Sequence, residues 1–221
     1  MVHHRNAIVR FSHSIGVLSF TKKHACRKRV KMRIEKQKTL SELLAQTEKL
    51  LNTAITEWQL VPHSQFARRQ LPYAWSANEC LQHLNSYGRY YLPAIEKSIV
   101  ASTDNIREFS PGWLGNYFTN LMKPQQGKVS KMNSPKDHRP VKIFESHLVV
   151  SEFIDQQERL LLLLRKCASA NWDARLPISL TQLIKLKLGD VLLFYTAHQE
   201  RHYLQAQRAL HAASANHKVG S

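Results

Sequence analysis

Apolar positions recur at the three-to-four-residue spacing of amphipathic helices in four segments of the chain. The first segment runs from about Leu40 to Leu60 and the second from about Ala77 to Ala101. The third covers roughly Phe144 to Ser169, and the fourth runs from Gly189 to about Ala212. Because four helices without an evident sheet pack best on one another, this pattern predicts an all-α fold, a four-helix bundle.

Capping signals mark the first two helix starts. Thr39 followed by Glu42 has the spacing of a capping box, in which each residue accepts a backbone N–H of the other. Ser76 and Glu79 repeat that spacing, and Trp75 occupies the apolar position before the cap. We therefore expect helices to begin close to Thr39 and Ser76.

Two long connections separate the later helices. The crossover from about Ser102 to Val141 contains a short amphipathic pattern, Trp113 to Met122, that we expect to pack as a helix. Its Lys-rich part, Lys123 to Arg139, is expected to be mobile, since connections of this length lid a site or lack order. In the second connection, between the third and fourth helices, the alternation Ile184 to Leu188 resembles a strand. Because no partner strand is evident, it is interpreted as an extended loop.

The formal net charge of +16 is concentrated at the N-terminus. Nine of the 32 Lys and Arg residues lie between Met1 and Arg33, where no acidic residue occurs. The remaining 23 basic and 16 acidic residues leave the body with a net charge of +7. The body also lacks a basic stripe with stacking aromatics, so no nucleic-acid partner is expected for the bundle.

The division of the chain follows from this charge pattern. Residues 1–32 form a basic arm, predicted to be disordered or to precede a true translation start at Met32; a tail for nucleic acid or membrane and an organelle-targeting segment are the alternatives. Residues 33–213 form the bundle and 214–221 a C-terminal tail. No window approaches a transmembrane span, so no membrane partner is expected. The odd set Cys26, Cys80 and Cys167 has no close pair, which favours a cytoplasmic location.

The most suggestive chemistry is the pair His198 and His202 on the fourth helix. Residues at i and i+4 share one helix face, so two imidazole nitrogens can reach one ion at about 2.0–2.1 Å. The spacing alone is a weak signal, but the helix around the pair is largely apolar. A buried histidine needs partners for both ring nitrogens, and a metal ion supplies one. Glu200 points away from the pair, unlike the base of His-Glu-x-x-His metalloproteases.

A third ligand must come from another helix, and His83 in the second helix is the best candidate. Its spacing alone favours the alternative, a partly buried histidine whose ring is satisfied by water. Cys80 and Tyr87 lie on the same face as His83, either beside the metal or, more commonly, as core residues. The rivals of His83 lie in loops or near helix starts: His63, His138 and His147.

Two sequence motifs resemble those of the DinB-like superfamily of small metal-binding bundles. They read Trp75-Ser-Ala-Asn-Glu-Cys-Leu-Gln-His83-Leu and Leu188-Gly-Asp-Val-Leu-Leu-Phe-Tyr-Thr-Ala-His198-Gln-Glu-Arg-His202-Tyr-Leu-Gln-Ala-Gln. The resemblance spans about Thr39 to Leu210. It implies a four-helix bundle with a long crossover connection and a metal triad of His83, His198 and His202.

The resemblance also implies a function. Members of this family are similar to thiol-dependent S-transferases, which use bacillithiol, mycothiol or glutathione, and to metal-dependent hydrolases. We therefore expect a divalent metal ion, zinc or nickel first, a small-molecule substrate such as a low-molecular-weight thiol, and a possible homodimer. A non-catalytic, metal-stabilised binding or stress-response module is the alternative. Arg201 could orient an acidic group or form an ordinary ion pair at the surface or between helices.

Overall fold

The computed structural model describes residues 32–101, 103–123, 134–140 and 144–218, with the backbone alone for 213–218. The chain divides between Lys31 and Met32, and every element described below belongs to the second unit. The predictions for residues 1–31, including the basic arm and Cys26, concern residues outside the described ones. Four long helices dominate that unit: α1 (Lys36–Thr56), α3 (Ala77–Ala101), α5 (Ser146–Lys166) and α6 (Leu188–Lys218).

Shorter elements join these helices. They are β1 (Ile34–Glu35), η1 (Trp58–Leu60), α2 (His63–Phe66), β2 (Glu108–Phe109), α4 (Trp113–Met122), η2 (Lys136–His138), β3 (Arg175–Ile178) and β4 (Thr181–Lys187). The strands form two antiparallel pairs, β1 with β2 and β3 with β4. The predicted all-α class is confirmed, and these pairs are small additions to it. In the described part of the chain, no helix is apolar over enough of its length to cross a membrane.

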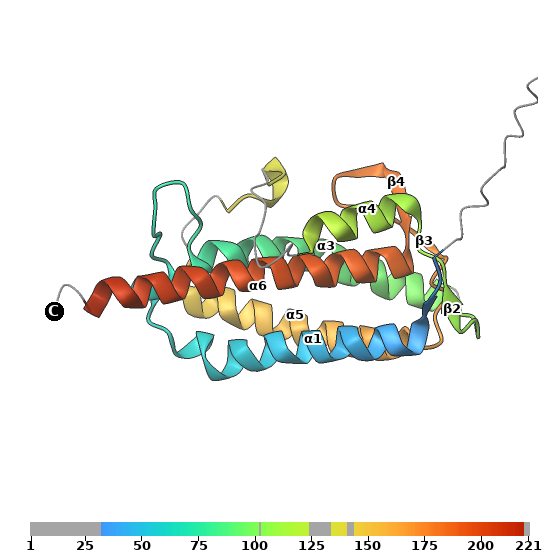
Figure 1. Cartoon of the computed structure of the whole chain (residues 1–221), viewed down its shortest axis with the longest axis horizontal. Coiled ribbons are helices and arrows are strands. Elements are labelled where there is room, and N and C mark those ends of the chain that lie inside the picture. The colour runs from blue at the N-terminus through green and yellow to red at the C-terminus, as the bar shows by residue number, and fades with distance from the viewer. Residues whose placement is uncertain (1–31, 102, 124–133, 141–143, 219–221) are drawn as a thin grey trace, which may run out of the picture. The chain divides into compact units, whose positions relative to one another are not determined.

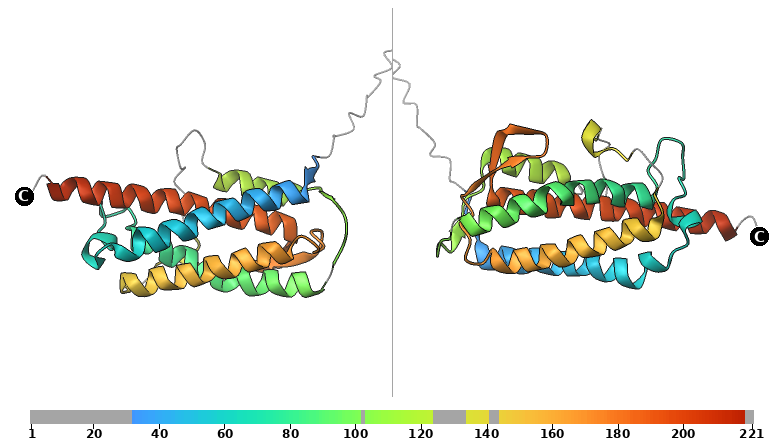
Figure 2. Two further views of the ribbon diagram at one scale, coloured as in Figure 1. Left: turned by 90° about the horizontal axis from the view of Figure 1, so that it is seen from below. Right: turned by 180° about the vertical axis from the view of Figure 1, so that it is seen from behind.

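The long helices form a ring in which α1 and α3 each pack against both α5 and α6 (Figure 1). Helices α3 and α5 run parallel, because Asn78 Nδ2 donates to Phe144 O near their starts and Arg159 pairs with Glu96 near their ends. The crossover between these two helices must therefore return along the bundle, and Figure 2 shows its described helix α4 alongside α6. This arrangement is the long crossover that the family resemblance implied.

Helix α6 completes the ring beside α1 and α3. It runs parallel to α1, since Gln46 Nε2 donates to Thr196 O and Thr53 Oγ1 lies 3.4 Å from the Tyr203 hydroxyl. Against α3 it runs antiparallel, so the first half of α3 faces the middle of α6. This pairing carries His83 to the level of His198 and His202.

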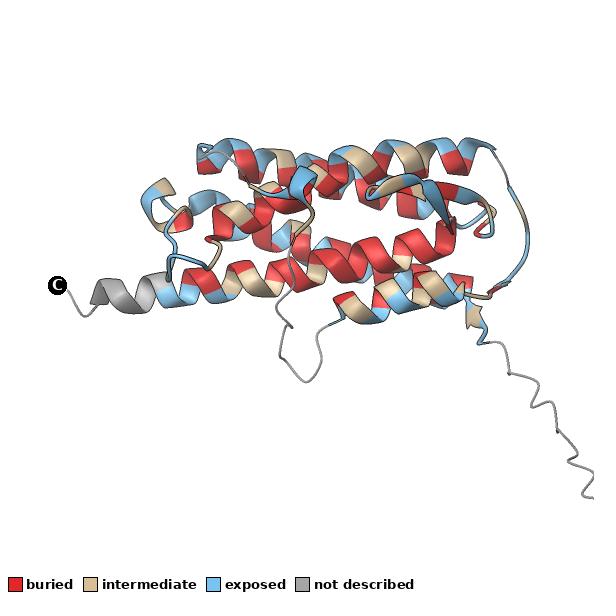
Figure 3. Cartoon of the chain, turned by 90° about the horizontal axis from the view of Figure 1, so that it is seen from above, coloured by how far each residue is buried: buried red, intermediate tan, exposed pale blue. Residues whose placement is uncertain are grey.

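Buried residues occupy the inward faces of all four helices (Figure 3). They form two clusters. One surrounds Tyr91 and Tyr195, whose rings lie 5.6 Å apart, and the other surrounds Trp58, whose ring lies 5.9 Å from that of Phe153. His83 precedes Leu84 of the second cluster and lies one turn before Tyr87 of the first. His83 therefore lies where the two apolar clusters meet.

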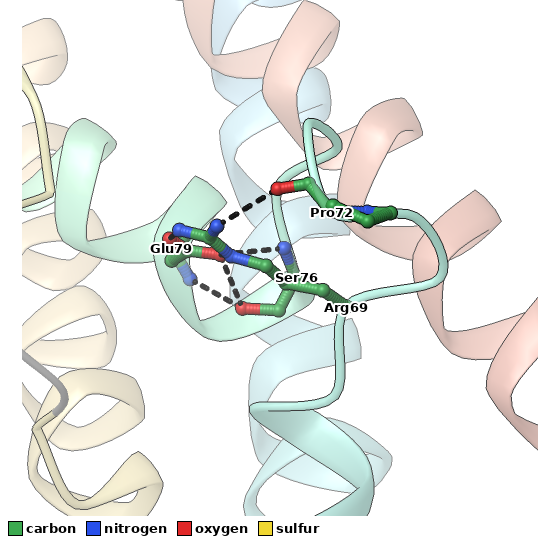
Figure 4. Close-up of polar contacts among 4 residues, drawn as sticks. All are labelled: Arg69, Pro72, Ser76 and Glu79. Carbon is green, nitrogen blue, oxygen red and sulfur yellow. Dashed lines mark hydrogen bonds and ion pairs between the residues drawn. The ribbon is translucent and has the colours of Figure 1, made fainter.

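The capping box predicted at the start of α3 is confirmed (Figure 4). Ser76 N donates to Glu79 Oε2 at 3.0 Å, and Glu79 N donates to Ser76 Oγ at 3.2 Å. Arg69 adds an ion pair to Glu79 and donates to Pro72 O at 3.1 Å. This network fixes the helix start from which His83 projects.

The capping box proposed at Thr39 is wrong. Helix α1 begins earlier, at Lys36, and Thr39 Oγ1 instead donates to Glu35 O at 2.8 Å. The earlier start is fixed by distant contacts that the local pattern does not contain. Lys36 N donates to Arg107 O beside the β1–β2 pair, and Lys36 Nζ pairs with Asp104 at 2.6 Å.

The interpretation of Ile184 to Leu188 as an unpaired loop is also wrong. Those residues belong largely to β4, which pairs with β3 in the register Leu176↔Leu186. Leu176, Ile178 and Leu186 are buried, so one face of this hairpin joins the core. Because β3 is short and contains Pro177, its pairing was not evident from the sequence.

Helix α4 occupies Trp113–Met122, as predicted. Its aromatic residues pack only in part, because Phe118 lies against the core whereas Trp113 and Tyr117 are exposed. Most of the Lys-rich segment lies outside the described residues, so its predicted mobility stays a prediction. The last helix extends to Lys218, beyond its predicted end near Ala212 and into the predicted tail.

Gly115 permits the close contact of α4 with α6, and Gly115→Ala is expected to destabilise the fold. An added Cβ would lie 2.2 Å from Asp190 Cγ and 2.3 Å from Asp190 Cβ, atoms too near the backbone to rotate away. Overpacking should outweigh the gain in helix propensity and lower the free energy of unfolding by about 2 kcal/mol in urea denaturation. Gly88→Ala is the matched control: its Cβ meets only the flexible end of Gln156, so an equal loss there would contradict this account.

Candidate metal centre

Three buried histidines converge between α3 and α6. His83 comes from the first half of α3, and His198 and His202 lie one turn apart on α6. One ring nitrogen from each forms a set in which all atoms lie within 4.8 Å of one another. We call these residues the histidine triad. A set of this size and chemistry could hold one metal ion.

The hydrogen bond on His83 fixes which of its nitrogens faces the triad. Its Nδ1 lies 2.7 Å from His138 O and 3.4 Å from Ser134 Oγ. A carbonyl only accepts, so Nδ1 carries the proton and Nε2 carries the lone pair. The free lone pair of Nε2 then points toward His198.

His202 has the same arrangement. Its Nδ1 lies 3.0 Å from Gln205 Oε1, an amide oxygen that can only accept. The proton is therefore on Nδ1 and the lone pair on Nε2. Oxygen acceptors of this kind orient metal-binding imidazoles and raise their basicity.

The ring nitrogens of His198 are not fully satisfied by hydrogen bonds from the described residues. Its Nε2 lies 3.1 Å from His83 Nε2, and its Nδ1 is buried without a partner among the described residues. With a proton on Nε2, Nδ1 would be an acceptor without a donor; with the proton on Nδ1, two lone pairs would face each other. A cation bound by both Nε2 atoms removes the repulsion of the second arrangement, in which the Nδ1 proton of His198 still has no acceptor among the described residues. Two nitrogens at about 2.0–2.1 Å from one tetrahedral ion lie about 3.3 Å apart, close to the observed spacing.

Burial keeps the triad neutral. Desolvation lowers the pKa of His83 to about 4 and is also the main cause of the strongly lowered pKa values of His198 and His202. The neighbouring imidazoles and Arg201 lower the pKa values of His198 and His202 further. Neutral imidazole is the form that binds a metal, so protons compete weakly at neutral pH.

Aromatic rings enclose the triad. The Trp75 ring lies 5.0 Å from that of His83, and the Phe194 ring stacks on His198 at 5.8 Å. The Tyr87 ring lies 4.9 Å from His83 and 4.4 Å from His198. Tyr87 is thus both a core residue and a direct neighbour of the triad, which combines the two alternatives that the sequence left open.

The two charged residues between the paired histidines point in different directions. Glu200 accepts from Gln46 Nε2 at 3.2 Å and so faces α1, as expected for a residue that does not act as the triad's base. Arg201 is buried, with 5 % of its surface exposed, which excludes the surface interpretation. Its positive charge acts on all three histidines.

A model of the DinB superfamily matches residues 39–206, a span that holds all three histidines. The chain belongs to the DinB superfamily. The match begins at Thr39, where the sequence resemblance began. Searches of curated proteins and of solved structures found no match.

The other candidate ligands lie outside the triad of this DinB-superfamily chain. His63 Nδ1 contacts Ser146 Oγ at 2.9 Å, and His147 is exposed on α5. His138 approaches with its backbone carbonyl rather than as a third ligand. Cys80 is fully buried in the core, and desolvation raises the pKa of its thiol, so it is an inert packing residue.

Sequence reasoning missed two acceptors that orient the triad. Gln205 was recognisable in principle, because it follows His202 at the i+3 spacing of facing helix residues. The His138 carbonyl had no local signal, since it comes from the crossover, 55 positions from His83. Only the folded chain brings these groups together.

Proposed function

We propose that the histidine triad binds one divalent metal ion, zinc or nickel, and that the protein is a metalloenzyme of the thiol-dependent S-transferase or hydrolase type. The observation that carries the proposal is the convergence of three buried nitrogens, two of them with lone pairs directed inward by Nδ1 hydrogen bonds. Imidazole ligation suits both metals.

Three nitrogen ligands leave a position open on a four-coordinate ion, as catalytic sites do. A divalent cation there would acidify a water molecule or a thiol. The three histidines are neutral ligands, so a divalent cation bound by them would keep its net positive charge. That charge favours an anionic group such as a thiolate or a carboxylate.

One observation favours a non-catalytic, metal-stabilised module as the second candidate. Among the described residues, the metal-ligand set contains no carboxylate, and Glu200 faces α1. Such a module lacks a general acid or base beside the ion. Turnover separates the two candidates, because only an enzyme consumes substrate.

Elemental analysis of the purified full chain tests the metal. We expect close to one zinc or nickel ion per chain in the parent and loss of that metal in His202→Ala. His211→Ala, an exposed histidine on the same helix, should retain it. Equal metal content in parent and His202→Ala, or none in either, would sink the proposal.

A thiol assay tests the reaction. Metal-loaded protein is incubated with glutathione, bacillithiol or mycothiol and an electrophilic acceptor, and the thioether product is measured. Product above the metal-free background, absent in His202→Ala, supports an S-transferase. A metal-loaded protein that shows neither thiol transfer nor hydrolysis of an ester or amide panel would instead be a binding module.

A further inference from the structure

The crossover delivers one more histidine to the neighbourhood of the triad. His138 lies in η2 and is 7 % exposed, although the residues before it, Lys136 and Asp137, are exposed. Its contacts are with α3, at Ser86, Tyr87 and His83. A buried imidazole in an otherwise exposed connection indicates that this side chain holds η2 against α3.

The His138 side chain is held by two groups of α3. Ser86 Oγ donates its only proton to His83 O at 2.7 Å, so toward His138 it can only accept. His138 Nδ1, 2.9 Å away, therefore donates to Ser86 Oγ. The His138 ring also lies over Tyr87, with centroids 3.9 Å apart.

The His138 main chain then reaches His83. Its carbonyl oxygen accepts the Nδ1 proton of His83 at 2.7 Å, the shorter of the two contacts of that nitrogen. The side chain that anchors η2 and the carbonyl that orients His83 belong to one residue. Displacing the side chain displaces the acceptor.

We propose that His138 is a positioning residue for His83: through Ser86 and Tyr87 it fixes the carbonyl that keeps the His83 proton on Nδ1 and its Nε2 free. The role of this arrangement in metal binding rests on the proposed function. The arrangement itself consists only of contacts among the chain's own residues. Without the acceptor, the proton of a neutral imidazole can move to Nε2, which removes the lone pair that a metal needs.

Nitrogen-15 NMR of the metal-free full chain tests the positioning directly. We expect His83 to show the Nδ1–H tautomer in the parent and a mixture of tautomers in His138→Ala. His138→Asn, whose amide N–H can replace the Nδ1 donor to Ser86, should restore most of the parent spectrum. Ser86→Ala removes the same bond from α3 and should give a similar mixture, so the test survives if His138→Ala does not fold.

Metal affinity gives the second readout, by competition with a chromophoric chelator. Loss of groups that orient a ligand weakens binding by about 10–100-fold, and we expect that loss in His138→Ala and within about 5-fold of parent affinity in His138→Asn. The exposed His147→Ala is the control and should match the parent. A parent-like His83 tautomer in both His138→Ala and Ser86→Ala, or equal loss in His138→Ala and His138→Asn, overturns the proposal. A parent that binds no metal would refute the proposed function, while the tautomer result still decides the positioning.

Discussion

Replacing His198 by alanine is expected to weaken zinc binding by about 1000-fold or more. Loss of an orienting partner alone costs 10–100-fold, and His198 is a direct ligand in the proposed site. Its Nε2 lies 3.1 Å from that of His83, close to the spacing of two nitrogens on one ion, so the substitution would leave two of the three proposed ligands. Titration of parent and variant against a competing chelator measures the difference.

The same substitution should remove the stabilisation that is expected from added zinc. At free zinc about 1000 times the parent dissociation constant, binding adds about 4 kcal/mol to the free energy of unfolding. A 1000-fold weaker variant gains less than about 1 kcal/mol under the same conditions. Each protein is unfolded in urea with zinc and with chelator, so that any cavity left by the imidazole cancels. Equal zinc stabilisation of parent and His198→Ala would contradict the three-histidine site, whereas His147→Ala should behave as the parent.

The second large effect concerns pH and Asp190, at the start of α6. Its carboxylate accepts Gly112 N–H at 3.0 Å and is 1 % exposed. Desolvation raises its pKa from 3.8 to about 6, despite that hydrogen bond and the nearby charge of Lys187. The folded state therefore binds this proton more tightly than the unfolded state. The stability that protonated Asp190 contributes is fully present below about pH 3.8 and is lost as the pH rises through about 6.

Asp190→Asn should reveal this loss, because the amide can accept the same N–H and does not ionise. The difference between the unfolded and folded pKa values of Asp190 corresponds to about 3 kcal/mol in the free energy of unfolding. About 2 kcal/mol of this is lost between pH 4.5 and 7.5. Over that range, the free energy of unfolding of the metal-free parent should fall relative to the variant by that amount. The histidines titrate in both proteins and cancel. A difference that does not change with pH would mean that Asp190 ionises as an ordinary carboxyl group.

The spacing of apolar residues was sufficient to predict the four long helices, because each must bury a continuous apolar face. The start of α3 was also predictable, since Ser76 and Glu79 are three residues apart and cap the helix by themselves. The start of α1 was not, because Lys36 is held by Arg107 and Asp104, which are distant from it in the sequence. The β3–β4 pairing was not predicted, for a similar reason: the stability of this hairpin depends on the core that Leu176 and Leu186 join.

The candidate site, too, was predictable from the sequence only in part. The sequence by itself determined that His198 and His202 share a face of α6, because helix geometry relates residues one turn apart. Family motifs, rather than spacing, selected His83 over its rivals. Only the tertiary structure decided that the three nitrogens meet and that Gln205 and the His138 carbonyl orient two of them. The reason is physical: ring orientation depends on acceptors from a distant segment, and that segment is placed by packing rather than by local sequence.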